Sequence, residues 1–385
     1  MLGTQGLIFS ERQQRVYSVN RSAVFIWSQL WDEGLSTHET ALRLSQLTGL
    51  DEAEAEQITN RCLRDWTALG LIGSSNELAA LAEDGEVRTS VKTSGCLSLE
   101  RCYSIDFLEC AGLQVAVGYP NALVAASVRA ILGHLRVFGA VEPDLSIEIQ
   151  GLADRYRIVA PGFEGSTASD PDGVAAQFKQ ALTEAILEND REVIALHAAA
   201  VLSPKGAVVL AGVSGSGKTT LAAVLNAGGW PCIADDIVIF KTGRIRVTGL
   251  PLAFSTKTRT WDVLRRAYPN LNDLPARVRP DGQIVRYIPP TVCADRRRDF
   301  DLCCVVLVNY SENRAEAAPP AEKSEALASL LKDARNSARR LTSTAFITAA
   351  ALVRRATCLR LDFSDPYTAG AQLQSILACS KADSP

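Results

Sequence analysis

The 385-residue sequence has few histidines, and it lacks long apolar or basic runs. It contains three histidines and ten cysteines but no C-x-x-C pair, so a zinc site is not expected. The longest apolar runs, residues 193–202 and 345–353, are shorter than the ~18–20 residues that span a bilayer. The formal net charge of −3 gives no general attraction to nucleic acid or to anionic membranes. We therefore expect neither a nucleic-acid partner nor a membrane partner.

The composition is that of an ordinary globular protein, with 47% hydrophobic and 22% charged residues. Its length leaves room for two or three domains. Residues 1–6 lack the charged and apolar segments of a secretory signal peptide. Cysteines in apolar surroundings, such as Cys303 and Cys304, suit a reducing compartment. A cytoplasmic location is expected.

One segment matches a complete G-x-x-x-x-G-K-[ST] phosphate loop, and it comprises Gly212, Val213, Ser214, Gly215, Ser216, Gly217, Lys218, Thr219 and Thr220. An apolar β-type run precedes it and a helix-forming run follows it, which is the context that this motif requires. Glycines let successive backbone N–H groups point at phosphate oxygens, and the helix N-terminus adds partial positive charge. Lys218 can reach the β- and γ-phosphates, and Thr219 can ligate Mg²⁺. The motif therefore predicts that the protein binds ATP and Mg²⁺.

Asp235 and Asp236 follow Lys218 by 17 and 18 residues, directly after the apolar run 232–234. In this position one carboxylate can hold the metal, while the other can accept a proton from an attacking hydroxyl. The alternative is a surface turn, where Asp–Asp pairs are common. His197 precedes Lys218 by 21 residues and lies in an apolar strand, where a lone histidine is usually a core residue.

Leu196-His197-Ala198, the phosphate loop and Ala234-Asp235-Asp236 together resemble the HPr kinase/phosphorylase family over roughly residues 190–300. These P-loop kinases phosphorylate a seryl hydroxyl on a protein. The resemblance implies an α/β, PEP-carboxykinase-like P-loop kinase core of mixed sheet and helices over residues 191–385. It implies that Asp235 accepts the proton, that Lys218 and His197 are active-site groups, and that Thr219 ligates Mg²⁺. We expect Asp236 to organise the metal together with Thr219. Related kinases form homo-oligomers, so the resemblance also admits a homo-oligomer.

The sequence departs from that family after the aspartate pair. The bifunctional members carry an acidic Glu-x-Arg-Gly-type signature there, whereas residues 247–252 contain no acid. This difference argues against phosphorolysis and against HPr itself as the substrate. Residues 250–257 and 285–290 instead resemble divergent HPr-kinase-related kinases. Lys257 and Arg286 are candidates for contact with phosphate or substrate, and the alternative is a solvated lysine and a structural arginine.

Residues 1–73 form a separate module in this reading. Two strand-like stretches precede three helices that begin after Asn20, Ser36 and Asp51, and a short strand is predicted at 71–72, which together make a winged-helix-like domain. Residues 15–27, 34–36 and 66–72 are similar to PqqD-like peptide-recognition domains, which bind leader sequences of ribosomally made peptides. A DNA-binding winged helix or a dimerisation module is the alternative, and five acids in the third helix disfavour DNA.

The remaining chain is divided by composition. Residues 74–95 are small and polar and are predicted to be a linker. Residues 96–190 alternate strand and helix signals, with helices at 121–137 and 173–188, and form an α/β subdomain packing on the kinase. Beyond them the apolar pattern predicts one strand over 193–202 and helices at 218–227, 258–267, 320–340 and 366–380.

A leader-binding domain joined to a hydroxyl-directed kinase suggests a specific substrate. The expected partner is a ribosomal precursor peptide whose leader binds residues 1–73, and the expected target is a serine or threonine hydroxyl. Similar tailoring kinases occur with lasso peptides. Two alternatives stay open at this point: a kinase of an HPr-like carrier or regulatory protein, and a nucleotide-gated peptide chaperone without phosphotransfer.

Overall fold

The computed structural model describes residues 6–72, 99, 102–139, 142–163, 167–312 and 318–378. The chain divides into two compact units, Met1–Gly95 and Cys96–Pro385. The predicted linker at 74–95 lies outside the described residues. Within the described ranges, no helix combines the length and the apolar character needed to cross a membrane.

The first unit is a β-hairpin followed by helices, as predicted. Its elements are β1 (Gly6–Ser10), β2 (Arg15–Val19), α1 (Arg21–Trp27), a π-helical turn (Ser28–Asp32), α2 (Thr37–Thr48) and α3 (Glu52–Ala68). The three predicted N-caps are confirmed: Asn20, Ser36 and Asp51 each accept a hydrogen bond from a backbone N–H three residues later. The strand predicted at 71–72 is wrong, because these two residues form a bend and pack on the helical core.

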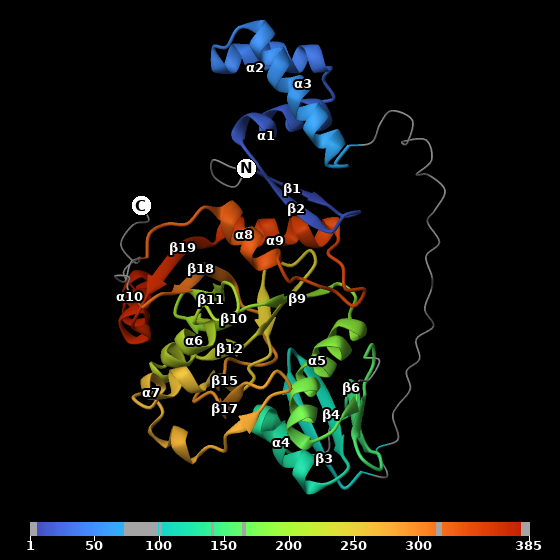
Figure 1. Cartoon of the computed structure of the whole chain (residues 1–385), viewed down its shortest axis with the longest axis vertical. Helices are drawn as coiled ribbons and strands as arrows, with labels where there is room; N and C mark the ends of the chain where they lie inside the picture. Colours follow the sequence, from blue (N-terminus) through green and yellow to red (C-terminus); the bar gives the residue numbers. More distant parts are fainter. Residues whose placement is uncertain are drawn as a thin grey trace. The chain divides into compact units, whose positions relative to one another are not determined.

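The second unit begins with a six-stranded sheet ordered β5-β3-β4-β6-β7-β8. Its strands are β3 (Ser104–Cys110), β4 (Leu113–Tyr119), β5 (Arg136–Val137), β6 (Leu145–Gly151), β7 (Tyr156–Val159) and β8 (Thr167–Ala168). The two predicted helices are confirmed as α4 (Ala122–Leu132) and α5 (Pro171–Asn189). Both helices contribute to one hydrophobic core with this sheet, and Figure 1 shows them beside it.

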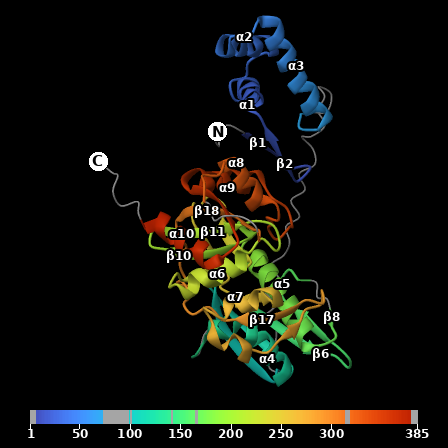
Figure 2. The ribbon, with the colours of Figure 1, turned by 60° about the vertical axis from the view of Figure 1, so that its left-hand side comes forward.

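The phosphate-loop sheet is five-stranded and mixed, in the order β12-β10-β11-β18-β19. Its strands are β10 (Ala199–Ser203), β11 (Gly206–Ala211), β12 (Cys232–Ala234), β18 (Leu302–Tyr310) and β19 (Thr357–Phe363). The helices α6 (Lys218–Ala227) and α10 (Pro366–Ala378) lie on one side of it, and α8 (Lys323–Leu331) and α9 (Ser343–Arg355) lie on the other (Figures 1 and 2). The predicted P-loop core of mixed sheet and helices is therefore confirmed.

Two small antiparallel sheets complete the second unit, in the orders β14-β13-β9 and β15-β17-β16. Their strands are β9 (Val193–His197), β13 (Ile237–Lys241), β14 (Val247–Gly249), β15 (Phe254–Lys257), β16 (Arg277–Val278) and β17 (Ile284–Ile288). The helix predicted at 258–267 is shorter than expected and consists of a 3-10 turn, Thr258–Thr260, followed by α7 (Trp261–Leu264).

The single strand predicted over 193–202 is wrong, because the chain changes sheets at Ala198. The strand β9 pairs with β13, whereas β10 pairs with β11 and β12. The chain makes a second change between β12 and β13, at Asp235 and Asp236. Both halves of 193–202 are apolar, so the sequence pattern carries no signal of the break.

The helix predicted over 320–340 is also wrong. The helix α8 ends at Leu331, and the following segment forms a backbone bridge in which Arg335 and Ala195 exchange hydrogen bonds of 2.9 and 3.0 Å. A left-handed residue, Arg339 at φ +56°, lies in the turn before α9. The segment between α8 and α9 brings Asp333 and Arg335 to the strand β9, which ends at His197.

We predict that the buried side chain of Asn226, at the end of α6, stabilises the second unit. Its amide nitrogen donates to the carbonyls of Trp230 and Val292 at 2.9 and 2.7 Å, and its oxygen accepts from the Thr291 N–H at 2.8 Å. Asn226→Ala leaves these buried groups unpaired and should lower the free energy of unfolding by roughly 2–4 kcal/mol. Urea denaturation measures this loss, and exposed Asn270→Ala is the control. Equal stability of the two variants would contradict the assignment.

Candidate active site

The phosphate loop connects β11 to α6 through three glycines in the left-handed region. Gly212, Gly215 and Gly217 have φ values of +152°, +85° and +95°. A Cβ on Gly212 would lie 2.6 Å from the Val308 carbonyl oxygen, and one on Gly217 would lie 2.8 Å from the Phe363 ring. Glycine is therefore required here both by backbone conformation and by space.

Lys218 is buried at the first position of α6 and lies against the loop. Its ammonium donates to the carbonyls of Gly212 and Val213 at 2.7 and 3.1 Å. Burial lowers the pKa of Lys218, and the nearby Lys257 acts in the same direction, while Asp235 and Asp333 raise it. The buried hydroxyl oxygen of Ser216 makes no hydrogen bond to the described residues. The loop thus holds one positive charge and one unsatisfied polar atom where phosphate oxygens are expected.

Asp235 directly follows β12 and is buried, with 2% of its surface exposed. Its Oδ2 accepts a hydrogen bond from the Ser255 N–H at 3.4 Å, whereas its buried Oδ1 makes none to the described residues. Burial raises the pKa of Asp235, and Lys179 and the Thr219 hydroxyl act in the opposite direction. A desolvated carboxylate with a free oxygen beside the phosphate loop is suited to accept a proton from a hydroxyl.

Asp236 and His197 lie close together, at the two places where the chain passes from one sheet to the other. Register pairs His197 with Ile237, so the end of β9 lies beside the aspartate turn. Asp236 has φ +74°, and its Oδ1 is 3.8 Å from His197 Nδ1. Burial lowers the pKa of His197, and Lys218 and Lys179 lower it further. A neutral imidazole is therefore favoured near neutral pH.

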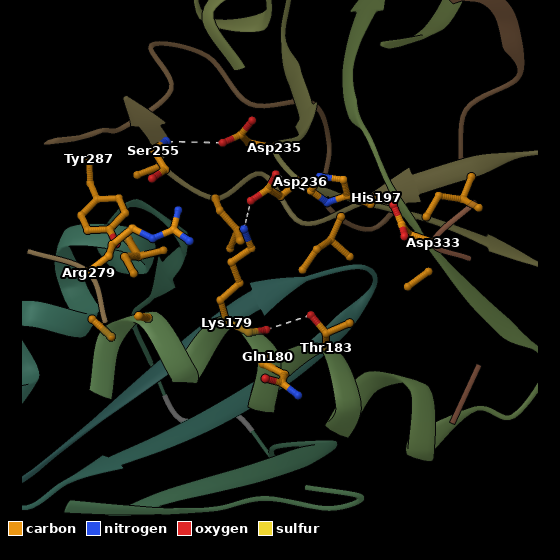
Figure 3. Close-up of a pocket in the computed structure, with 18 of the residues that line it drawn as sticks. Lys179, Gln180, Thr183, His197, Asp235, Asp236, Ser255, Arg279, Tyr287 and Asp333 are labelled. Carbon is orange, nitrogen blue, oxygen red and sulfur yellow. Dashed lines mark hydrogen bonds and ion pairs between the residues drawn. The ribbon is translucent and has the colours of Figure 1, made fainter. Parts of the chain in front are cut away.

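A pocket of about 540 Å³ lies beside the aspartate pair (Figure 3). Asp235, Asp236 and His197 line it, and the helix α5 forms another wall. None of the described residues of the phosphate loop lines this pocket. Asp235 therefore belongs to two regions at once. The Thr219 hydroxyl and the Lys218 charge on the phosphate-loop side both lower its pKa, and Asp235 also lines the pocket. A hydroxyl-bearing acceptor in this pocket would lie next to the carboxylate.

The pocket also contains polar residues that the sequence analysis missed, namely Lys179, Ser255, Arg279, Tyr287, Asp333 and Arg335. Lys179 reaches from α5 and forms an ion pair with Asp236 (Figure 3). A lysine among alanines on a largely buried helix was a sequence signal that could have been used. Ser255 and Tyr287 lie on the two short strands β15 and β17, and the other three lie outside the helices and strands. No periodic sequence pattern marks any of these positions.

The two weaker candidates, Lys257 and Arg286, lie on the neighbouring strands β15 and β17 and do not line the pocket. Arg286 donates to the Asn272 side chain at 2.7 Å, and its guanidinium lies 4.1 Å from the centre of the Trp261 ring. Lys257 is close enough to Lys218 to lower the pKa of that lysine. Lys257 therefore lies near the phosphate loop, as expected for a residue that contacts phosphate. The contacts of Arg286 are those of a structural arginine.

The residues present fit a magnesium–nucleotide complex. Asp235, Asp236 and Thr219 offer the carboxylate and hydroxyl oxygens that Mg²⁺ prefers. The unsatisfied oxygens of Asp235 and Ser216 are buried polar atoms that otherwise cost stability. The glycine-rich turn before α6 leaves no room for side chains and so admits phosphate against its backbone.

No protein-family model and no curated protein matches the chain. The solved structure of the Hpr(Ser) kinase/phosphatase from Coxiella burnetii is similar, with 11% sequence identity and a TM-score of 0.22. The match covers 48% of this chain and 93% of that chain. At this level it carries no argument about activity, and the PqqD-like character of residues 1–73 also stays a prediction.

Gly217→Ala should weaken ATP binding at least tenfold, because the added Cβ meets Phe363 and forces the loop to move. The matched control is Gly243→Ala, where φ is also positive, at +78°, but where a Cβ would meet nothing within 4 Å. Isothermal titration with a non-hydrolysable ATP analogue measures both affinities. An equal loss in the two variants would show that strain alone, and not loop shape, is responsible.

Proposed function

We propose that the protein is an ATP- and Mg²⁺-dependent kinase that phosphorylates a serine or threonine hydroxyl of a ribosomally made precursor peptide. One observation carries the kinase assignment. The buried carboxylate of Asp235 lies between the phosphate loop and a polar pocket that can hold an acceptor. The peptide substrate rests on the PqqD-like resemblance of residues 1–73, and a lasso-peptide precursor is the proposed kind.

The residues of the site have distinct roles in this proposal. The acceptor hydroxyl gives its proton to Asp235 as its oxygen bonds to the γ-phosphorus, and the bond from that phosphorus to the leaving oxygen of ADP breaks. Lys218 and the loop N–H groups stabilise the negative charge on the transferred phosphoryl group. Thr219 and Asp236 would hold a metal ion, which would neutralise charge on the phosphates of the nucleotide. Neutral His197 lies beside the aspartate turn, 3.8 Å from Asp236 Oδ1, where it either polarises a phosphate oxygen or orients Asp235.

The first unit is proposed to recognise the leader. A peptide can add a strand to a small sheet and fill a groove against a helix, and this unit offers both a hairpin and helices. Among residues 6–72, the large exposed apolar side chains are Trp31, Leu47 and Leu69. Tethering the leader raises the local concentration of the core peptide to about the millimolar range, which allows a permissive acceptor pocket.

Asp235→Asn should lower the rate of phosphotransfer by roughly 10²–10⁴-fold, because the amide cannot accept the hydroxyl proton. ATP affinity should change little, since the buried volume and the loop are kept. The exposed Asp262→Asn is the control and should keep full activity. Transfer is followed by intact mass spectrometry of the peptide, which gains about 80 Da per phosphate. Full activity of Asp235→Asn would remove this residue from the base role.

The leader should lower the KM of the peptide by roughly 10²-fold or more with little change in kcat, because it supplies binding energy away from the reacting hydroxyl. The measurement compares the full precursor peptide, the core peptide alone and a precursor with a scrambled leader, each with the full-length protein. Equal kinetic constants for all three would contradict leader guidance while leaving the kinase assignment intact.

A further inference from the structure

The helix α5 forms one wall of the pocket although it belongs to the chain before the phosphate-loop sheet. Five of its residues line the pocket at helical spacing, namely Ala175, Ala176, Lys179, Gln180 and Thr183. Of these five, only Lys179 carries a charge. Its ammonium forms an ion pair with Oδ2 of Asp236, as Figure 3 shows. A residue from the 102–190 region thus reaches the aspartate to which the metal is assigned.

Apart from the neighbouring carboxylates, the surroundings of Lys179 disfavour its charged form. Burial lowers its pKa to about 8, and the nearby Arg279 acts in the same direction, whereas Asp235 raises it. About 30% of its side chain is exposed, compared with 23% for Asp236. On a buried helix face, an apolar side chain often stabilises the fold as well as a partly buried ion pair does, or better. The lysine therefore calls for a reason other than packing.

The carboxylate of Asp236 already has a partner group near each oxygen. Oδ2 lies against Lys179, and Oδ1 lies 3.8 Å from His197 Nδ1. These are the same hard oxygen atoms that Mg²⁺ prefers. Two cations beside one carboxylate repel each other, and the repulsion is stronger in a pocket that is shielded from water. Lys179 and a metal ion are thus alternatives at this carboxylate.

We propose that Lys179 is a positioning residue, whose ammonium holds the Asp236 carboxylate and competes with a divalent cation for it. The inference rests on the proposed function in one respect, that Asp236 is a metal ligand. Lys179 keeps Asp236, with its left-handed backbone, neutralised and oriented before nucleotide binds. It also raises the concentration of divalent cation that is needed for the cation to bind Asp236. The helix α5, which carries Lys179, is therefore part of the site.

Competition predicts that removing the lysine tightens metal binding. Mn²⁺ is the probe, and its affinity is measured by electron paramagnetic resonance on the full-length protein saturated with a non-hydrolysable ATP analogue. Lys179→Met and Lys179→Gln should each lower the Kd of Mn²⁺ about tenfold, as expected when a unit charge leaves a partly exposed carboxylate. Lys179→Arg keeps the charge and should stay near the wild-type value.

The matched control is Lys241→Met. Lys241 forms an ion pair of 2.7 Å with Asp190 at the other end of β13, and both side chains are 34% exposed. This variant loses a comparable ion pair and should leave Mn²⁺ affinity unchanged. Thermal melts confirm that each variant is folded. If Lys179→Met unfolds, Lys179→Gln, which keeps a polar side chain, provides the measurement.

The sign of the effect separates the proposal from a structural role. If Lys179 only packs α5 against the site, folded Lys179→Gln binds Mn²⁺ equally well or more weakly, and that result overturns the proposal. Peptide phosphorylation is assayed on the same wild-type sample. Tighter Mn²⁺ binding by the variants without any phosphorylation by the wild type would support this inference and contradict the proposed function. Normal phosphorylation with unchanged Mn²⁺ affinity in the variants would overturn this inference alone.

Discussion

The burial of one carboxylate, that of Asp235, constrains the arrangement of the whole site. Desolvation makes its charged form costly, so the charge persists only where cations and hydrogen-bond donors surround it. Lys179 and Lys218 supply the cations from two different helices, and Ser255 supplies a backbone N–H. The phosphate loop, the pocket and α5 must therefore converge on this residue for the fold to tolerate it.

These groups converge because the chain crosses twice between the small β14-β13-β9 sheet and the phosphate-loop sheet. The chain leaves the β9–β13 pair for the β10–β12 pair at Ala198, and it returns at Asp235 and Asp236. The left-handed backbone at Asp236 permits the sharp return. This geometry places His197 beside the aspartate turn without long side chains or loops. His197 is thereby fixed by strand pairing, and Asp235 and Asp236 are held in a two-residue turn between two paired strands. Phosphotransfer requires such fixed positions.

The extent to which the sequence predicts this site depends on how local each signal is. The phosphate loop and the helix caps at Asn20, Ser36 and Asp51 follow from neighbouring residues, and all were predicted. The break at Ala198 was missed because both flanking segments are apolar, and the helix predicted over 320–340 hid the turn that brings Asp333 to His197. Lys179 lies 57 residues from Asp236, so their ion pair depends on how α5 packs, and no local pattern reports it.

The most direct test of phosphotransfer by this protein is to follow each phosphate of ATP separately. The full-length protein is incubated with a precursor peptide, Mg²⁺ and ATP labelled at either the α- or the γ-phosphorus. A kinase transfers only the γ-label to a hydroxyl of the peptide, in equal amount with the ADP formed. Release of the γ-label as free phosphate with an unlabelled peptide, or transfer of the α-label, would contradict the assignment of a kinase.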